Sequence, residues 1–411
     1  MSTQPALLFY CQHSLGMGHL ARAWALAEAL CDEFTVVLAS GGARPRGLRP
    51  PRDVEVIDLP ALSQDESGRL WVVGDSRSVD QVRATRSALL LDIYRRVRPS
   101  VVVVELFPFG RRKFGRELMP LLDATLSTPR PIVVSSVRDL LVDRGTEQQR
   151  HDDRAAAILD AYFDAVLVHT DPRFSTLAET FRPSALPTTR IHHTGFVVSR
   201  IVDRPDPAAG DRRARHAGDD RTRPILVSGG GGRFARPLYE TSIAAHRQLG
   251  PTAPPMIVVA GPLCPDETIQ QLRSASAGDD RIRIVETVPD LGGEMRASCI
   301  SVSQCGYNTA LDILQARVPA LVVPFADNGD SEQTHRATRL AQLNALRMLP
   351  PSELQPDALA TAIHDTLNFV PDPIGMDLDG GRRSTRLLAD MCRNVRQSGP
   401  VAARQCDESL A

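Results

Sequence analysis

Residues 300–312, ISVSQCGYNTALD, contain the pattern from which the fold can be worked out. The first four residues, Ile-Ser-Val-Ser, form a short strand-like run with two apolar residues, and a Gln-Cys-Gly turn separates this run from an amphipathic segment. A bounded apolar run is typical of a buried strand, and small or hydroxyl residues after a turn favour a helix start. The stretch therefore predicts a strand–turn–helix unit of a parallel sheet, in which ligands bind beyond the carboxyl ends of strands.

Similar apolar runs recur on both sides of this stretch. In the second half of the chain they lie at residues 225–227, 256–260, 282–285 and 320–324. The first half has its own set of strand-like runs at 6–11, 34–39, 101–105, 132–135 and 165–169, with helix-like stretches at 21–30 and 87–96. Strands that alternate with helices indicate parallel α/β sheets. We therefore expect two doubly wound Rossmann-like domains of the α/β class that face each other across a cleft.

A polar stretch between the two sets marks the expected domain boundary. It is rich in charge, proline and glycine and has no hydrophobic period, as expected for a linker. The predicted segments are an amino-terminal domain at 1–198, the linker at 199–223, a carboxyl-terminal domain at 224–380, a last helix at 381–395 and a disordered tail at 396–411. The cleft between the two domains is the expected site.

Composition excludes several classes of protein. Of the 411 residues 42% are apolar, and 48 basic residues nearly balance 49 acidic ones, so we expect no nucleic-acid partner. No apolar run approaches the length of a membrane-spanning helix, and no basic residue precedes Arg22, as a secretory signal would need. The seven cysteines are scattered and form no zinc motif. The expectation is a cytoplasmic protein without a metal ion.

A glycine-rich turn with a histidine follows the first apolar run. Gly16 and Gly18 precede His19, which lies on the first turn of the helix that follows. A helix amino terminus disfavours a protonated imidazole, so His19 is a candidate general base. The alternative is a histidine that caps or packs at this turn.

The same turn also permits a dinucleotide site. Gly16 and Gly18 with Ala21 match a weak form of the dinucleotide fingerprint. The second strand ends without the acidic residue that would hold a ribose, although Arg44 or Arg46 could hold a 2′-phosphate. NADP binding therefore stays open as an alternative.

Two turns of the second half suit a nucleoside diphosphate. The run at 225–227 leads into four glycines, 229–232, whose backbone N–H groups can approach an anion closely. The helix start at Thr309 offers further free N–H groups and a hydroxyl, and Asp312 could accept hydrogen bonds from a ribose. Glu332 and Gln333 combine an acid with an amide, which suits sugar hydroxyls.

The order of these motifs resembles the donor-binding signature of nucleotide-sugar glycosyltransferases with the GT-B fold. The resemblance extends over residues 225–345 and is weaker over 1–200. The motif order is similar both to that of small-molecule UDP-glycosyltransferases and to that of family 28, the UDP-GlcNAc transferases of peptidoglycan lipid synthesis. The chain resembles most a branch of uncharacterised bacterial glycosyltransferases. Gln304 stands where the small-molecule enzymes have a histidine.

The resemblance implies an inverting transferase that needs no metal and no cofactor, and a nucleotide sugar as its substrate, expected to be UDP-linked. His19 would deprotonate the acceptor hydroxyl, and Glu105 or Asp139 would orient His19. The implied donor-binding residues are Gly229, Gly230, Gly231, Gln304, Gly306, Asn308, Thr309, Asp312, Glu332 and Gln333.

The acceptor side is expected at Gly16 and Gly18 together with Phe107 and Arg111. Residues 106–114 combine aromatic and cationic side chains, which could rest on an anionic membrane surface, so that the chain would bind the inner face of the membrane peripherally. The alternative is an ordinary helix start whose aromatic residues pack in the core. The acceptor stays open between a lipid-linked molecule and a small natural product.

Two further functions share this architecture. One is an isomerase of the nucleotide-sugar 2-epimerase type, which needs no acceptor. The other is a nucleotide-sugar binder without catalysis.

Overall fold

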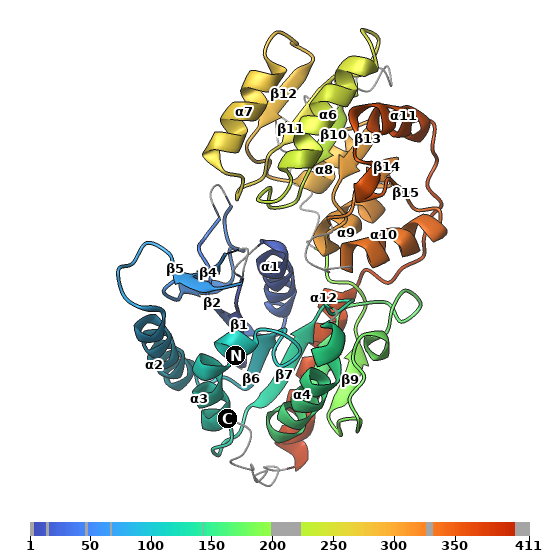
Figure 1. Cartoon of the computed structure of the whole chain (residues 1–411). Helices are drawn as coiled ribbons and strands as arrows, with labels where there is room; N and C mark the ends of the chain where they lie inside the picture. Colours follow the sequence, from blue (N-terminus) through green and yellow to red (C-terminus); the bar gives the residue numbers. More distant parts are fainter. Residues whose placement is uncertain are drawn as a thin grey trace. The chain divides into compact units, whose positions relative to one another are not determined.

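The computed structural model describes residues 4–13, 16–45, 48–65, 68–142, 144–198, 223–325 and 332–398. The chain forms two compact units (Figure 1). Unit 1 comprises Met1–Arg44, Arg49–Ser199 and Met376–Ala411, and unit 2 comprises Pro45–Leu48 and Arg200–Gly375. Almost the whole predicted linker, residues 199–222, lies outside the described residues.

Unit 1 is built on a seven-stranded parallel sheet with the order β3-β2-β1-β6-β7-β8-β9. Its strands are β1 (Ala6–Cys11), β2 (Thr35–Ser40), β3 (Glu55–Asp58), β6 (Val101–Glu105), β7 (Ile132–Val137), β8 (Ala165–Val168) and β9 (Arg190–His193). A small antiparallel hairpin, β4 (Leu62–Gln64) and β5 (Leu70–Val72), lies apart from this sheet. The five apolar runs predicted as strands in this half are all confirmed.

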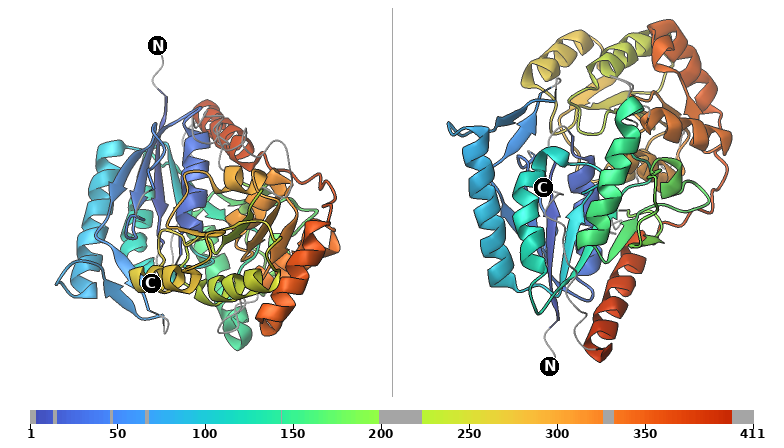
Figure 2. Two further views of the ribbon diagram at one scale, coloured as in Figure 1. Left: turned by 90° about the horizontal axis from the view of Figure 1, so that it is seen from above. Right: turned by 60° about the horizontal axis from the view of Figure 1, so that its bottom comes forward.

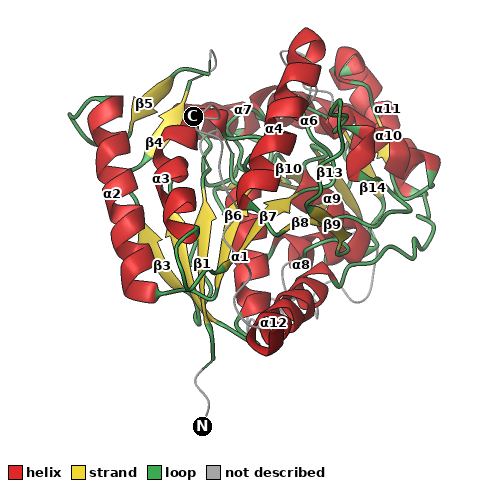
Figure 3. Ribbon diagram, turned by 90° about the horizontal axis from the view of Figure 1, so that it is seen from below, coloured by secondary structure: helices red, strands yellow, loops and turns green. Residues whose placement is uncertain are grey.

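Helices cover both faces of this sheet (Figure 3). One face packs against α2 (Val79–Val97), α3 (Gly115–Thr125) and α4 (Gln148–Tyr162). The other face packs against α1 (Gly18–Leu30) and α12 (Gly380–Ser398). Short 3-10 turns, η1 (Arg112–Phe114), η2 (Gly145–Glu147) and η3 (Leu177–Glu179), complete the unit. Because both faces are buried, the central strands are mostly apolar, which made them recognisable in the sequence.

The last described helix returns to unit 1. Leu388, Ala389 and Cys392 of α12 are buried in the same cluster as α1, and Thr385 Oγ1 donates a 3.0 Å hydrogen bond to Ala29 O. Figure 2 shows α12 beside the first sheet. Unit 2 ends at Gly375, five residues before the expected boundary, and α12 extends over part of the expected tail.

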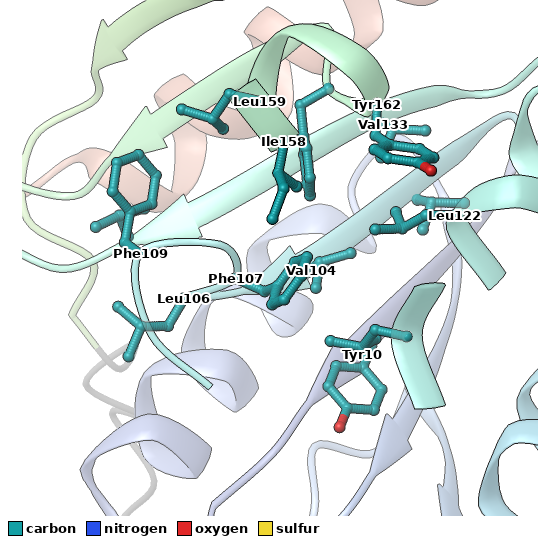
Figure 4. Packing of buried hydrophobic residues seen from close by; sticks show 14 of the residues in the cluster. Tyr10, Val104, Leu106, Phe107, Phe109, Leu122, Val133, Ile158, Leu159 and Tyr162 are labelled. Atoms are coloured by element: carbon teal, nitrogen blue, oxygen red, sulfur yellow. The ribbon is translucent and has the colours of Figure 1, made fainter. Parts of the chain in front are cut away.

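The aromatic loop after β6 belongs to the core of unit 1. Phe107 and Phe109, both labelled in Figure 4, are 4% and 2% exposed. The ring centroid of Phe107 lies 6.5 Å from that of Phe163. Phe114 is also buried, and α3 begins directly after it. The membrane-resting alternative for these aromatic residues is therefore wrong, because apolar rings in the core cannot contact lipid, and the helix-start alternative is confirmed.

Unit 2 repeats the architecture with a six-stranded parallel sheet of order β12-β11-β10-β13-β14-β15. Its strands are β10 (Ile225–Ser228), β11 (Met256–Val259), β12 (Ile282–Val285), β13 (Ile300–Ser303), β14 (Ala320–Val322) and β15 (Arg347–Met348). Helices α6 (Arg236–Gln248), α7 (Asp266–Ser276) and α11 (Pro356–Leu367) share one core cluster with the sheet. Helices α8 (Leu291–Arg296) and α9 (Tyr307–Ala316) pack together on the opposite face, followed by α10 (Glu332–Gln342) and η5 (Pro351–Glu353) (Figure 1).

Each sheet has a point at which the strand order reverses. In unit 1 this point lies between β1 and β6, and in unit 2 between β10 and β13. In open α/β sheets, ligands bind in the crevice outside the carboxyl ends of the strands at such a point. We therefore expect ligands to bind at the loops after β1, β6, β10 and β13.

Candidate functional site

The crevice of unit 1 brings His19 and Glu105 together. His19 lies in the first turn of α1, and Glu105 is the last residue of β6. The two side chains are joined by a 2.6 Å contact between His19 Nδ1 and Glu105 Oε1. Of the two acids predicted as candidates to orient His19, Glu105 is the one that contacts it.

Glu105 is fully buried and remains ionised because cationic groups surround it. Arg22 Nη2 donates a hydrogen bond to Oε1, and Arg111 Nε lies 3.9 Å from Oε2. Burial alone would raise the pKa of Glu105, but His19, Arg22 and Arg111 lower it to about 2. The carboxylate can therefore only accept hydrogen bonds at neutral pH.

This carboxylate fixes the proton on His19. Burial lowers the pKa of His19 to about 3, against the opposing effect of Glu105 and assisted by the positive charge of Arg111. The imidazole is therefore neutral at pH 7, and its one proton must lie on Nδ1, which donates to Glu105. Nε2 keeps its lone pair, and the side chain retains 17% exposure. A neutral, partly accessible imidazole in this tautomer can accept a proton from a hydroxyl group.

Further polar residues at this edge were not singled out from the sequence. Ser136, at the end of β7, pairs in register with Glu105. His169 follows β8, and its Nε2 lies 2.8 Å from Ser136 Oγ while its Nδ1 lies 2.9 Å from Thr194 Oγ1. Burial lowers the pKa of His169 to about 3, with Arg22 acting in the same direction, so this ring is neutral too. Their common signal was a polar residue at or just after a buried strand.

The other predicted residues of unit 1 have different surroundings. Asp139 is fully buried, and its main-chain oxygen accepts a 3.4 Å hydrogen bond from Ser175 Oγ. Gly18 is the exposed first residue of α1, and a β-carbon on Gly16 would meet nothing within 4 Å. Phe107 lies in the core, so it is not an exposed acceptor-side residue.

The two arginines named as possible 2′-phosphate ligands provide little structural support for NADP binding. Arg44 Nη2 lies 2.6 Å from Asp58 Oδ2 in an exposed ion pair. Arg46 lies outside the described residues. The dinucleotide alternative is left for a binding experiment.

In unit 2 the two predicted turns meet. Strands β10 and β13 are neighbours, with Ser228 paired to Ser303, so the loops that follow them lie side by side. Gly230 has a φ of +59°, and a β-carbon on it would lie 3.9 Å from Thr309 Oγ1 in the first turn of α9. A β-carbon on Gly306, which caps α9, would meet nothing within 4 Å. The N–H groups of the α9 amino terminus therefore border open space beside a glycine turn, as an anion-binding site requires.

The glycines of the turn have separate roles. A β-carbon on Gly229 would lie 2.0 Å from Ala235 Cβ, so Gly229 is needed for packing against the start of α6. Gly231 lies against Gly261, whose β-carbon would approach Gly231 C to 2.6 Å. A pocket of about 390 Å³ opens beside this contact, lined by residues 261–266, Ile269, Glu286 and Thr287.

Asp312 lies one turn beyond Thr309 and has an unusual protonation equilibrium. Burial raises its pKa to about 7, with the charge of Asp290 acting in the same direction and Arg296 against it. Asp290 itself caps α8 by accepting a hydrogen bond from Gly293 N. Asp312 thus titrates close to neutral pH, and its ionised form is a strong hydrogen-bond acceptor.

The two amides expected to hold donor groups, Gln304 and Gln333, form hydrogen bonds with the backbone. Gln304 Nε2 donates to Phe234 O at 3.3 Å. Gln333 Oε1 accepts hydrogen bonds from Cys305 N at 3.0 Å and Phe325 N at 3.1 Å. Sequence patterns could not show these contacts, because they join segments far apart in the chain.

Arg336 is a further residue that the sequence gave no reason to select. Its Nη2 lies 2.5 Å from Glu332 Oε1, and its Nη1 donates to Cys305 O at 2.8 Å. Arg336 and Glu332 are both buried. Together with Gln333 they fix the turn before α9, on which Asn308 occupies the second helical position.

Neither a membrane-spanning helix nor a metal-binding cluster is present in the described residues. No helix there combines the length and the apolar character that a membrane crossing demands. Within the same part of the chain, no three His, Cys, Asp or Glu side chains gather closely enough to bind a metal ion.

Residues 225–377 match the family model of the glycosyltransferase family 28 C-terminal domain. A relative from Methylibium petroleiphilum is the UDP-N-acetylglucosamine--N-acetylmuramyl-(pentapeptide) pyrophosphoryl-undecaprenol N-acetylglucosamine transferase. It is 27% identical over 247 residues, which cover 57% of this chain and 65% of the relative. The chain thus spans less than two thirds of that relative's length.

Solved structures share the fold over nearly the whole chain. The glycotransferase of kitacinnamycin superposes with a TM-score of 0.55 at 15% identity, covering 97% of this chain and all of its own. A Listeria monocytogenes protein provisionally assigned as a UDP-N-acetylglucosamine 2-epimerase superposes with a TM-score of 0.58 at 14% identity, covering 99% and 100%. The predicted GT-B fold and the relationship to family 28 are confirmed.

Proposed function

We propose that this chain, a GT-B relative of family 28, is an inverting, metal-independent glycosyltransferase that uses a UDP-linked sugar. The observation that carries the proposal is the meeting of the glycine turn at Gly230 with the amino terminus of α9 at Thr309. This arrangement lies within the residues that match the family model. It supports binding of a diphosphate, the feature that nucleotide sugars share.

In the proposed complex, backbone N–H groups of the glycine turn and of Gly306–Thr309 hold the diphosphate. The helix dipole stabilises the charge that develops on the leaving group, so no metal ion is needed for that purpose. Asp312 accepts hydrogen bonds from the ribose, and the neighbouring pocket at Glu286 and Thr287 takes the base. Glu332 and Gln333 border the donor sugar.

Catalysis is assigned to His19. Nε2 removes the proton from an acceptor hydroxyl, and the resulting oxygen forms a bond to the anomeric carbon while the bond from that carbon to the diphosphate oxygen breaks. Attack from the face opposite the leaving group inverts the configuration. Glu105 holds the tautomer and stabilises the imidazolium that forms, as its 2.6 Å contact with Nδ1 allows.

The acceptor and location are the finer parts of the proposal. The Methylibium relative is a transferase that acts on a pyrophosphoryl-undecaprenol. The solved structure described above is the glycotransferase of kitacinnamycin. We propose a hydroxyl acceptor of either kind and a cytoplasmic enzyme. Peripheral contact with the inner face of an anionic membrane is part of the lipid-linked version.

A thermal-unfolding panel tests the donor assignment. The full chain is heated with UDP, UDP-GlcNAc, UDP-glucose, TDP-glucose or NADPH. A ligand at a hundred times its Kd stabilises the folded state by about 2.7 kcal/mol, so binding gives a clear shift in Tm. The proposal expects stabilisation by the UDP compounds and none by NADPH. Stabilisation by NADPH alone would replace it with the dinucleotide alternative.

A further inference from the structure

The Glu105 carboxylate uses its two oxygens unequally. Oε1 accepts hydrogen bonds from both His19 Nδ1, at 2.6 Å, and Arg22 Nη2. Oε2 is buried, and within the described part of the chain it accepts no hydrogen bond. Arg111 Nε lies 3.9 Å from Oε2, about 1 Å longer than an ordinary N–H···O hydrogen bond. Such a buried oxygen costs free energy and calls for a physical explanation.

Arg111 is a natural second partner for this carboxylate. Guanidinium and carboxylate groups pair most strongly when two parallel N–H···O bonds join them. A small rotation of the Glu105 side chain toward Arg111 would form such a pair and would take Oε1 away from His19. Charge and burial do not decide between the two arginines, because both are cationic and mostly buried, with 2% of the Arg22 side chain and 12% of the Arg111 side chain exposed.

The backbone on both sides of the carboxylate is held in place. The Cys11 thiol, at the end of β1, donates a hydrogen bond to His19 O at 3.7 Å. In the loop that carries Arg111, Phe107 O accepts a 2.7 Å hydrogen bond from Ser135 Oγ of β7. The backbone of His19 therefore cannot follow a carboxylate that turns toward Arg111, so such a turn breaks the contact with the imidazole.

Arg22 gives α1 the advantage in holding this carboxylate. It lies three residues after His19 on α1, so the two side chains share one face of the helix. Because both donate to the same oxygen, Arg22 holds Oε1 where His19 Nδ1 needs it. Burial raises the pKa of Glu105, and the charges of His19, Arg22 and Arg111 lower it in that order, in agreement with the closer contact of Arg22.

We propose that Arg22 is a positioning residue, which keeps the Glu105 carboxylate on His19 in competition with Arg111. The inference rests on the proposed function only for its effect on the reaction rate, because the contact can be observed without a substrate. When Arg22 is lost, Glu105 stays ionised beside Arg111 but turns away from His19. The imidazole then loses the fixed Nδ1–H tautomer that leaves Nε2 able to accept a proton.

Substitutions at Arg22 separate positioning from stability. Arg22→Met removes the charge and the donor. Arg22→Lys keeps a charge, but its shorter side chain lacks the planar fork of arginine and holds Oε1 less firmly. The matched control is Arg130→Met. Arg130 Nη1 lies 2.7 Å from Asp164 Oδ1 in another largely buried pair, but these residues precede β7 and β8 and lie at the opposite edge of the sheet.

Proton and 15N NMR of the full-length protein reports on both partners of Glu105. The proton in the 2.6 Å contact between His19 and Glu105 gives a far-downfield signal, which is assigned with His19→Gln. We expect Arg22→Met to lose this signal while the Nε–H signal of Arg111 moves downfield. Arg130→Met should keep both signals in place, although Tm falls in both methionine variants.

The lysine variant tests the competition directly. Arg22→Lys should lose part of the His19 signal, and adding Arg111→Met should restore it, because the competing guanidinium is then absent. Hydrolysis of UDP-GlcNAc should fall about tenfold to a hundredfold in Arg22→Met, part of the factor that general base catalysis contributes, and should be unchanged in Arg130→Met.

Two results would overturn the inference. Persistence of the His19 signal in Arg22→Met would mean that Arg22 only stabilises the core. Loss of that signal without movement of the Arg111 signal would mean that the two arginines do not compete. If Arg22→Met does not fold, a full signal in Arg22→Lys, or a reduced one that Arg111→Met leaves unrestored, would overturn it equally. Failure of the wild type to hydrolyse any nucleotide sugar would count against the proposed function alone, because the NMR signals do not depend on it.

Discussion

Replacing Glu105 with glutamine tests the arrangement around His19 most sharply. The substitution keeps the shape and one acceptor oxygen but removes the charge. Arg22, which is 2% exposed, then keeps its positive charge in the core without the carboxylate that it contacts. Removing one partner of a buried ion pair costs about 3–5 kcal/mol, because the remaining charge is poorly solvated. We expect the free energy of unfolding to fall by that amount.

Catalysis should fall as well, for a separate reason. Without the carboxylate, the imidazolium that forms during proton transfer loses the negative charge 2.6 Å from Nδ1, and the Nδ1–H tautomer is held less firmly. General base catalysis contributes about 10²–10⁴-fold in rate, and we expect most of that factor to be lost. Hydrolysis of the nucleotide sugar, with water as acceptor, provides the assay.

A double variant separates the two effects. Glu105→Gln with Arg22→Met replaces the buried pair by neutral groups, which is often neutral for stability. The double variant should recover most of the unfolding free energy in urea but none of the rate. Glu55→Gln, in the exposed ion pair of Glu55 and Arg96, is the control and should change stability by less than about 1 kcal/mol. An unfolding free energy of the Glu105 variant within about 1 kcal/mol of wild type would refute the reasoning.

Three further predictions follow from the charges and glycines of the two crevices. Because the pKa of His19 is lowered to about 3, hydrolysis should not lose its base as the pH falls through 6.5, the usual value for histidine, and a rate that follows a pKa near 6.5 would contradict this. Asp312 has a pKa raised from 3.8 to about 7, so its ionisation destabilises the fold as the pH rises through this window. At pH 8 the free energy of unfolding of Asp312→Asn should therefore exceed that of the wild type by at most about 4 kcal/mol. This stabilisation should vanish below pH 4. The same ionisation should strengthen binding of a UDP-sugar, measured by calorimetry, as the pH rises through 7 in wild type but not in the variant. Gly230→Ala and Gly250→Ala both place a side chain at positive φ, +59° and +84°, so each should lose about 1 kcal/mol of stability. The Gly230 variant alone should lose donor affinity, because its methyl group lies beside Thr309, and equal affinities of both variants would refute the diphosphate site.

Most of the two sheets could be predicted because their strands are buried on both faces. Residues 6–11, for example, are a continuous apolar run and form β1, and residues 300–303, in which Ile300 and Val302 alternate with serines, form β13 over the expected bounds. The edge strands β3, β9 and β15 were missed. Three of the four residues of Arg190–His193 are polar because an edge strand faces solvent, and such a short segment has no clear period.

The candidate site was predictable in part for the same reason. Carboxyl ends of neighbouring parallel strands meet, so Glu105 and Asp139 were both reasonable partners for His19. The choice between them depends on which face of the sheet α1 covers. Glu105 shares the face of Val101 and Val103, which packs against α1, but both faces are apolar and the sequence does not distinguish them.

The roles of Gln304 and Gln333 could not be predicted from the sequence, because they depend on tertiary contacts. Both were expected at the donor because amides suit sugar and phosphate groups. The structure shows Gln333 Oε1 accepting from two backbone N–H groups that lie 28 and 8 residues away, and Gln304 donating to Phe234 O. No local pattern carries such information.

The central claim is that the neutral His19, held by Glu105, activates a nucleophile against a nucleotide sugar. The most direct measurement is real-time proton NMR of UDP-GlcNAc incubated with the full chain and with His19→Ala, without any acceptor. Since this donor is α-linked, we expect slow release of UDP with GlcNAc appearing first as the β-anomer, and at least a hundredfold slower release by the variant. Epimerised sugar, the α-anomer first, or equal rates for the two proteins would contradict the account.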